Sequence, residues 1–286
     1  MESGPPPTLE DLAQRYYSPD DPSLKGAGYL RAYTRLLEPR RQEPLAILEL
    51  GVSTGASLLS WHDYLPNATI IGIDIEPPPA RVVGVDRVHV LQGDQADPAL
   101  LDQAAAIVGR PFDLIIDDAS HFGHLTKRSL HYLFPRLLAP GGWYVIEDFG
   151  TGFLPHYADG TVYVPPDWTD AQPHTREYRS SQFGMVGIVK QLIDAMMQEV
   201  ATGARSYLAI ERLLIEPNIV FIEKSRQPGA PWPGPMPDKP RLPEPPDDLR
   251  VRLDEHAARL AELERVVSRL RRVLAPVLWL RRSLRK

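Results

Sequence analysis

Two short apolar runs that each end in a pair of acids constrain the fold of this chain more than any other feature. They read L-I-I-D-D at residues 114–118 and W-Y-V-I-E-D at residues 143–148. Apolar residues at helical spacing fill residues 126–138 between them, and P-G-G at 140–142 predicts the end of that helix. A strand–helix–strand unit makes its strands parallel neighbours about 5 Å apart. Both acidic ends should therefore meet at the carboxyl edge of a sheet, where open sheets bind ligands.

Strand and helix patterns alternate through much of the chain. Apolar runs predict strands at residues 46–50, 69–73, 88–91, 114–116 and 143–146, and helical periodicity covers 57–65, 99–108, 126–138 and 184–200. This alternation indicates an α/β fold with a mostly parallel sheet. Residues 207–214 and 218–223 are predicted to form two antiparallel strands that close it.

The rest of the chain predicts appendages around one central domain. We expect an N-terminal helical arm at 1–43, the central domain at 44–226, a Pro-rich linker at 227–247 and an amphipathic helix at 248–286. Residues 150–182 carry no clear period, which is typical of a lid or an acceptor-binding loop.

The C-terminal segment carries apolar residues at alternating three- and four-residue steps from Leu253 to Val277. Such a heptad seam favours self-association, although Pro276 argues against one straight coiled coil. The segment ends apolar and basic, without an acid after Glu264. Docking on an anionic membrane surface is the alternative interpretation.

Composition excludes several classes of function. The formal net charge of -5 gives no electrostatic reason to expect a nucleic-acid partner. The absence of cysteine excludes disulfides, thiolate metal sites and a cysteine nucleophile. The sequence shows neither a secretory signal nor a long apolar run. We therefore expect a cytoplasmic protein, with peripheral contact at the inner membrane face left open.

The first predicted strand leads into E-L-G-V-S-T-G at residues 49–55. The loop lacks the central glycine of a dinucleotide fingerprint, so it suits a ligand without a pyrophosphate. Glu49 can accept a hydrogen bond from a cationic ligand group. Asp74 follows the second strand, as the ribose-binding acid does in nucleoside-binding sheets, and Asp94 follows the third, within reach of an adenine amino group. Each of these aspartates alone is equally at home as a turn or cap residue.

The ordered motifs ILELGVSTGASLLSW, IIGIDI, LQGDQAD, IIDDASH and GGWYVIEDF resemble the class I S-adenosylmethionine-dependent methyltransferases. More narrowly, they resemble the metal-dependent sugar O-methyltransferases that tailor macrolides of the mycinamicin and tylosin type. The resemblance spans residues 8–225 and includes KGAGY at 25–29, GFLPHYADG at 152–160 and NIVFIEK at 218–224. The family's usual Thr-Asp-Lys after the first tyrosine is replaced by S-P-D-D at 18–21, which leaves the N-terminal contacts open.

The resemblance implies a Rossmann-like methyltransferase sheet and a complete set of site residues. The predicted S-adenosylmethionine site consists of Glu49, Gly51, Ser53, Gly55, Ser57, Asp74, Asp94 and Asp117. Asp118, Glu147 and Asp148 are expected to bind Mg²⁺ or Mn²⁺, and His121 is expected to be the general base.

The residues themselves suit that chemistry. A sugar hydroxyl is a poor nucleophile near neutral pH, and a divalent ion together with a nearby base overcomes this. Oxygen ligands favour magnesium, manganese or calcium, and His121 lies three residues beyond Asp118 at the strand's exit. In the alternative interpretation, D-D-A-S-H is only a strand-to-helix turn and His121 faces solvent.

The predicted acceptor is a sugar hydroxyl of a glycosylated natural product or glycan. Two other functions remain open: methylation of a catechol-like hydroxyl, or a scaffold or membrane-recruitment role with a vestigial methyltransferase core. Aromatic rings stack on sugar faces, so four residues of the irregular segment are candidate acceptor contacts: His156, Tyr157, Trp168 and His174.

Overall fold

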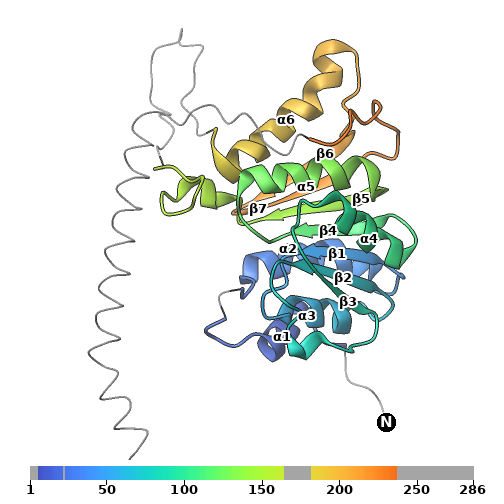
Figure 1. Ribbon diagram of the computed structural model, residues 1–286, viewed down its shortest axis with the longest axis vertical. Coiled ribbons are helices and arrows are strands. Elements are labelled where there is room, and N and C mark those ends of the chain that lie inside the picture. Colours follow the sequence, from blue (N-terminus) through green and yellow to red (C-terminus); the bar gives the residue numbers. More distant parts are fainter. Residues whose placement is uncertain (1–5, 22, 164–181, 237–286) are drawn as a thin grey trace, which may run out of the picture. The chain divides into compact units, whose positions relative to one another are not determined.

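The computed structural model describes residues 6–21, 23–163 and 182–236. Its core is a seven-stranded sheet in the order β3-β2-β1-β4-β5-β7-β6 (Figure 1). The strands are β1 (Ala46–Leu50), β2 (Thr69–Asp74), β3 (Val88–Gln92), β4 (Phe112–Asp117), β5 (Leu138–Glu147), β6 (Ile210–Glu216) and β7 (Ile219–Lys224). Strands β1 to β5 are parallel, and β7 runs antiparallel to its neighbours β5 and β6. The predicted α/β fold, with its antiparallel closing pair, is confirmed.

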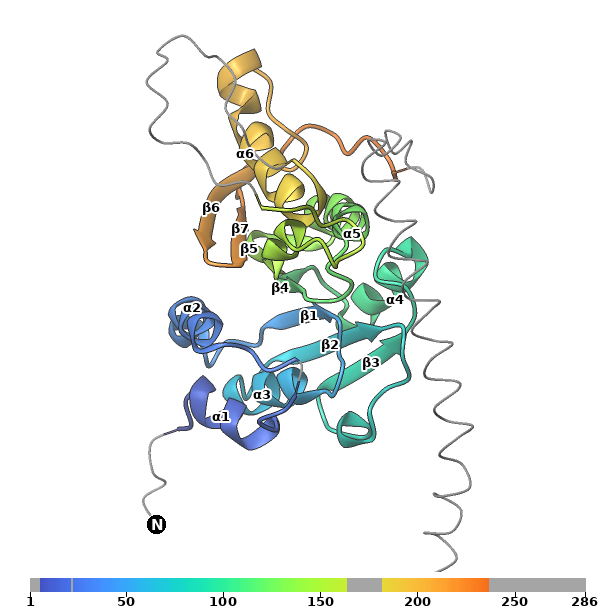
Figure 2. The ribbon, with the colours of Figure 1, turned by 90° about the vertical axis from the view of Figure 1, so that its left-hand side faces the viewer.

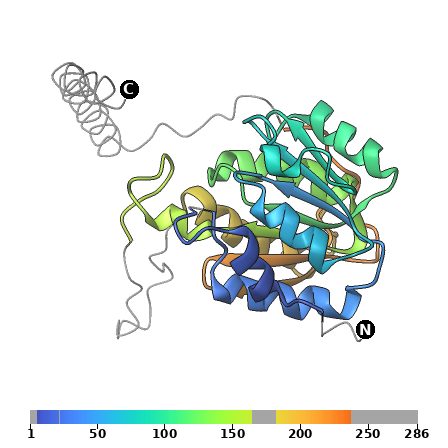
Figure 3. The same cartoon turned by 90° about the horizontal axis from the view of Figure 1, so that it is seen from below.

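Helices cover both faces of the sheet (Figures 2 and 3). One face is covered by α1 (Leu9–Tyr16), α2 (Ala27–Leu37) and α3 (Ala56–Tyr64), and the other by α4 (Pro98–Val108), α5 (Gly123–Arg136) and α6 (Gly184–Thr202). Successive strand residues point to opposite faces. Within β1, Ile47 accordingly joins the core under α1–α3, whereas Leu48 joins the core under α4–α6.

The first helix of the N-terminal arm begins with a capping box. The Thr8 hydroxyl accepts from the Asp11 amide at 3.1 Å, and the Asp11 carboxylate accepts from the Thr8 amide at 2.9 Å. This capping box satisfies two amides that the first helical turn leaves free. Helix α1 then packs on α3, where the Tyr16 hydroxyl donates to Asp63 at 2.5 Å.

The boundary between α5 and β5 differs from the one that the P-G-G segment predicts. The helix ends at Arg136, and β5 begins at Leu138 and runs through the P-G-G segment. The pairing shifts register there, from Phe112 opposite Leu138 to Leu114 opposite Trp143. The bulge accommodates Pro140, which has no amide N–H, and Gly141, which has φ 76°. The strand therefore continues through this segment.

The edge strand β6 was predicted three residues too early. It spans Ile210–Glu216 rather than 207–214, and most of its side chains are at least partly exposed. An edge strand with one neighbour shows little apolar alternation, so its sequence marks its limits poorly.

The chain divides into two units, residues 1–236 and 237–286. The second unit, with the predicted terminal helix, lies outside the described residues, as does 164–181 of the predicted lid. In the part of the chain that is described, none of the helices has the length and apolar character needed to cross a membrane. Residues 149–153 form a short 3₁₀ helix, η3 (Phe149–Phe153), immediately after β5.

Candidate active site

A cavity of about 470 Å³ lies at the carboxyl edge of the sheet. Its wall includes Gly51 and Ser53 of the β1–α3 connection and Ser57 in the first turn of α3. It also includes four residues from the ends of β4 and β5: Asp118, His121, Glu147 and Asp148. Seven of the predicted site residues therefore line one cavity. The volume of this cavity is within the range of known ligand pockets.

The β1–α3 loop depends on glycine because the chain passes close to the end of β4. Gly51 has φ 91°, and a Cβ there would lie 2.2 Å from the Asp118 carbonyl oxygen. Gly55 caps α3 with φ 79°, and Ser53 between them also has a positive φ of 49°. Only glycine adopts such conformations without strain, so the two glycines let this loop bend beside the cavity.

Asp74 supports the same loop from the end of β2. Its Oδ2 accepts from the Val52 and Ser53 amides at 2.7 and 2.9 Å. Burial raises the pKa of Asp74, but these backbone hydrogen bonds and one from Glu76 bring it below its usual value. Its predicted contact with a ribose remains a prediction.

Two further aspartates are held away from the cavity wall. Asp94 accepts from the Ala96 amide at 2.8 Å, as a turn residue does. Asp117 is buried and accepts from Tyr144 at 2.9 Å and from Gln95 at 3.1 Å. Burial raises the pKa of Asp117 to about 6 despite these donors. Neither lines the cavity, and their predicted cofactor contacts remain untested.

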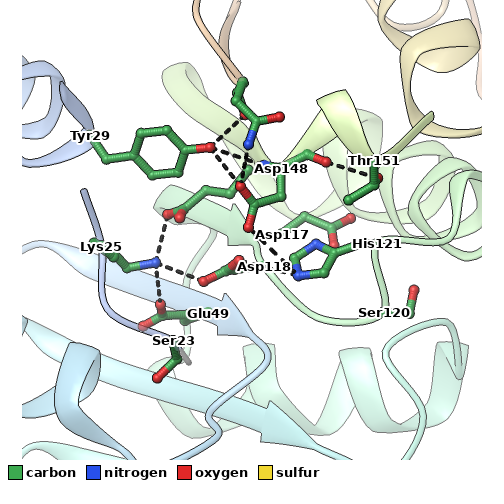
Figure 4. A network of polar contacts seen from close by, with 12 residues as sticks. Ser23, Lys25, Tyr29, Glu49, Asp117, Asp118, Ser120, His121, Asp148 and Thr151 are labelled. Carbon is green, nitrogen blue, oxygen red and sulfur yellow. Dashed lines mark hydrogen bonds and ion pairs between the residues drawn. The ribbon is translucent and has the colours of Figure 1, made fainter. Parts of the chain in front are cut away.

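Asp118, His121 and Asp148 form a cluster that could hold a metal ion, with one ligand atom from each within 4.8 Å of the others. His121 Nε2 lies 3.9 Å from Asp118 Oδ1 and 3.8 Å from Asp148 Oδ2 (Figure 4). Two ligands of one octahedral Mg²⁺ lie about 3 to 4 Å apart, given metal–oxygen distances of about 2.1 Å. The spacing and the carboxylate oxygens therefore fit a hard divalent cation.

Lys25, in the loop before α2, lies among three carboxylates of the site. Its Nζ lies 2.8 Å from Asp118 Oδ2, 2.7 Å from Glu147 Oε1 and 3.5 Å from Glu49 Oε1. Its side chain is only 2% exposed. Burial lowers the pKa of Lys25, but the surrounding carboxylates more than offset this and raise it well above its usual value. The lysine is thus a fixed positive charge beside the cavity.

Glu147 and Glu49, which both contact Lys25, are buried. Glu147 also accepts from the Tyr33 hydroxyl at 2.6 Å, and burial together with Asp118 raises its pKa. Glu49 accepts from the Trp61 indole at 2.9 Å, and burial raises its pKa too. Glu49 Oε1 has no hydrogen-bond partner among the described residues. That oxygen is instead ion-paired with Lys25 Nζ at 3.5 Å, and Glu49 is not among the residues that line the cavity. Glu147 lines the cavity, and its Oε1 accepts two hydrogen bonds.

Sequence reasoning assigned no site role to Lys25, Tyr29, Tyr33 or Asn218. Tyr29 and Asn218 contact Asp148, and Lys25 and Tyr33 contact Glu147. The one available signal was KGAGY, which carried the family resemblance without a stated role. Among the candidate acceptor residues, the Tyr157 ring lies 6.5 Å from the His121 ring. Trp168 and His174 lie outside the described residues.

Known proteins with similar sequences are methyltransferases. No family model matches the chain. Demethylmacrocin O-methyltransferase from Streptomyces fradiae is 33% identical over 231 residues, covering 76% of this chain and 53% of that protein. A Streptomyces olivaceus protein named 8-demethyl-8-alpha-L-rhamnosyl tetracenomycin-C 2'-O-methyltransferase is 30% identical over 214 residues, 70% of this chain and 51% of that one. The chain spans about half the length of both curated relatives.

Solved structures agree with the sequence relatives. The MycE methyltransferase from the mycinamycin biosynthetic pathway, in complex with Mg, SAH and mycinamycin VI, superimposes with a TM-score of 0.62 and 30% sequence identity. The match covers 85% of this chain and 58% of that one. With these relatives in sequence and in fold, the chain belongs to the class I S-adenosylmethionine-dependent methyltransferases and is similar to those that methylate macrolide sugars.

Proposed function

We propose that this chain transfers a methyl group from S-adenosylmethionine to a sugar hydroxyl of a glycosylated natural product or glycan. The proposal includes dependence on Mg²⁺ or Mn²⁺. One observation carries it: the glycine loop and the Asp118, His121 and Asp148 cluster line the same cavity. A cofactor beside the loop and an acceptor beside the cluster would then meet inside that cavity, where fixed positions favour direct transfer.

The loop end of the cavity suits the cofactor. Asp74 fixes the loop amides, and Gly51 leaves room beside β4. The buried Glu49 Oε1 lacks a hydrogen-bond partner among the described residues and is ion-paired with Lys25, and we keep its predicted role toward a cationic group of the cofactor. The proposed cofactor site also includes the remaining residues predicted from the sequence, which are Ser53, Gly55, Ser57, Asp94 and Asp117.

The cluster suits activation of a hydroxyl. We assign the metal to Asp118 and Asp148, with Glu147 as the third predicted ligand. A divalent ion bound there would stabilise negative charge on the acceptor oxygen. His121 Nε2 faces both aspartates and accepts the hydroxyl proton. The new O–CH₃ bond forms as the S–CH₃ bond breaks, and S-adenosylhomocysteine leaves.

A sugar acceptor is favoured over the alternatives. The curated relative named for a rhamnosyl compound methylates a 2' oxygen by its name, and MycE was solved with mycinamycin VI. A catechol-like acceptor has no comparable support. A vestigial core in a scaffold protein would not need the acids and His121 to converge on one cavity as they do.

The proposal extends to the segments outside the described residues. The heptad seam of 248–286 supports self-association, and its basic end supports peripheral contact with an anionic membrane face. A cytoplasmic location accords with both. The boundaries at 43, 226 and 247 remain those that the sequence predicts.

A methyl-transfer assay tests the function directly. Purified protein is incubated with methyl-labelled S-adenosylmethionine and a panel of glycosylated macrolides and polyketides, their aglycones and simple catechols, with Mg²⁺ or with a chelator. We expect labelled product from at least one glycosylated acceptor, none from its aglycone, and none with the chelator. Labelling of catechols alone would refute the sugar assignment, and labelling in chelator would refute the metal dependence.

A further inference from the structure

The two aspartates of the cluster are held in the same manner. Each has one carboxylate oxygen bound to a neighbour and the other directed toward His121. Lys25 holds Asp118 Oδ2, which leaves Oδ1 on the side of His121. Asp148 Oδ1 is held by Asn218 and Tyr29, which leaves Oδ2 on that side. The groups that hold these oxygens therefore set the direction of the free ones.

We propose that Asn218 is a positioning residue for the metal site, because its carboxamide fixes Asp148 and so directs Oδ2 toward His121, on the side where a cation would bind. The proposal rests on the proposed function in that it needs a metal at the cluster. Asn218 lies 70 residues from Asp148 in the sequence, in the turn between β6 and β7. No role in the site follows from its sequence position alone.

Strand register brings the two residues together. Glu147 at the end of β5 pairs with Ile219 at the start of β7. The antiparallel pairing therefore places Asn218 across from Asp148. The turn needs a left-handed residue, and Asn218 has φ 68°, a conformation that asparagine tolerates better than most residues.

The orientation of the carboxamide follows from its partners. The Gly150 amide, which can only donate, gives a hydrogen bond to Asn218 Oδ1 at 2.6 Å. The amide nitrogen must therefore face the other way, where Nδ2 donates to Asp148 Oδ1 at 2.5 Å. Gly150 permits this approach, because a Cβ there would lie 2.4 Å from Asn218 Oδ1. Asn218 thus joins the turn, Asp148 and the start of η3.

Asn218 is a steadier donor to Asp148 than Tyr29. The Tyr29 hydroxyl lies 2.7 Å from Asp148 Oδ1 and 2.8 Å from the Asn218 carbonyl oxygen. Its single proton serves only one acceptor at a time. The Asn218 amide has a proton directed at Asp148 whichever acceptor the tyrosine chooses. Asp148 itself has φ 53°, so its backbone also depends on surrounding contacts for this conformation.

Two substitutions test the proposal by different routes. Asn218→Gly removes the carboxamide and keeps a residue that suits a positive φ. Gly150→Ala keeps the carboxamide and displaces it. Asn67→Gly is the matched control, because Asn67 uses its carboxamide on the exposed Gln42 carbonyl away from the cavity. The readouts are Mn²⁺ affinity and the Mn²⁺ electron paramagnetic resonance spectrum, alongside S-adenosylhomocysteine affinity without metal, all on the full chain.

We expect Asn218→Gly and Gly150→Ala to weaken Mn²⁺ binding about 10- to 100-fold, the usual effect of losing such a partner, and to alter the spectrum. S-adenosylhomocysteine affinity should not change, and Asn67→Gly should match the wild type in both. Wild-type Mn²⁺ affinity in both site variants would overturn the inference, as would equal losses of metal and cofactor binding in both. If the wild type binds cofactor but no Mn²⁺, the metal part of the proposed function fails first and the inference falls with it.

Discussion

The sharpest test of the buried charge network is Lys25→Met. This change removes the only described cation among Glu49, Asp118 and Glu147 and keeps an apolar stem of similar length. Glu49 and Glu147 have side chains 1% and 2% exposed, so loss of the ammonium group leaves their charges poorly solvated. Removing one partner of a buried ion pair costs about 3–5 kcal/mol, a large share of the roughly 5–15 kcal/mol that stabilises a domain.

This cost is large enough to measure by thermal and denaturant unfolding. For a domain of this size, 1 kcal/mol shifts Tm by about 2–4 °C, so we expect Tm to fall by about 6–20 °C at pH 7.5. Lys25→Met/Glu147→Gln removes both partners and should recover part of the loss. A loss of less than about 1 kcal/mol in the single variant would refute the assignment of Lys25 as the buried counter-charge.

The pH dependence gives an independent check. The pKa of Lys25 is higher in the folded protein than the value of about 10.5 in the unfolded chain. The stability that Lys25 contributes is therefore complete below about pH 10.5 and is lost only as the pH rises through its pKa in the folded protein. In Lys25→Met the burial-raised pKa values of Glu147 and Glu49 dominate. The stability these two contribute when protonated is lost as pH rises above about 4.5. The deficit relative to wild type should therefore be small near pH 5 and larger at pH 8, and a deficit independent of pH would contradict this reasoning.

Two further predictions concern the glycine loop and the C-terminal segment. Gly51→Ala should destabilise the protein and weaken S-adenosylhomocysteine binding, because the new Cβ would meet the Asp118 carbonyl oxygen. Gly84 is the control, since it has a similar φ of 78° but nothing within 4 Å of an added Cβ. Gly84→Ala should lower the free energy of unfolding by only about 1–2 kcal/mol and leave binding intact. Equal effects of the two would contradict the close-approach argument. Deleting residues 248–286 should lower the number of chains per particle, which is the mass measured by light scattering divided by the mass of one chain. An unchanged number would count against self-association through the heptad seam.

Much of the sheet could be predicted because buried parallel strands have a local signature. β1, β2 and β4 are short apolar runs that end at a glycine turn or an acid, and their limits fell within two residues of the prediction. β6 has no such signature, because its side chains are largely exposed. β5 began earlier than predicted because a bulge absorbs Pro140 and its neighbouring glycines.

The acids of the site could be predicted for the same reason, since strand ends are visible in the sequence. Their partners could not. Lys25 contacts Glu147 across 122 residues, and Tyr29 contacts Asn218 across 189. A lysine in a polar loop has the sequence appearance of a surface residue, and only packing of the N-terminal arm buries it. The resemblance indicated that His121 and both aspartates share one site, but the distances of 3.9 and 3.8 Å between them required the three-dimensional structure.

The most direct test of the central claim compares His121→Ala with His124→Ala. Both histidines lie near the start of α5, but His121 lines the cavity and His124 does not. With an acceptor identified by the methyl-transfer assay, turnover is measured beside S-adenosylhomocysteine affinity. We predict that His121→Ala lowers kcat about 10²- to 10⁴-fold with cofactor affinity retained, and that His124→Ala leaves both unchanged. Turnover of His121→Ala close to wild type would contradict the assignment of His121 as the base that accepts the hydroxyl proton.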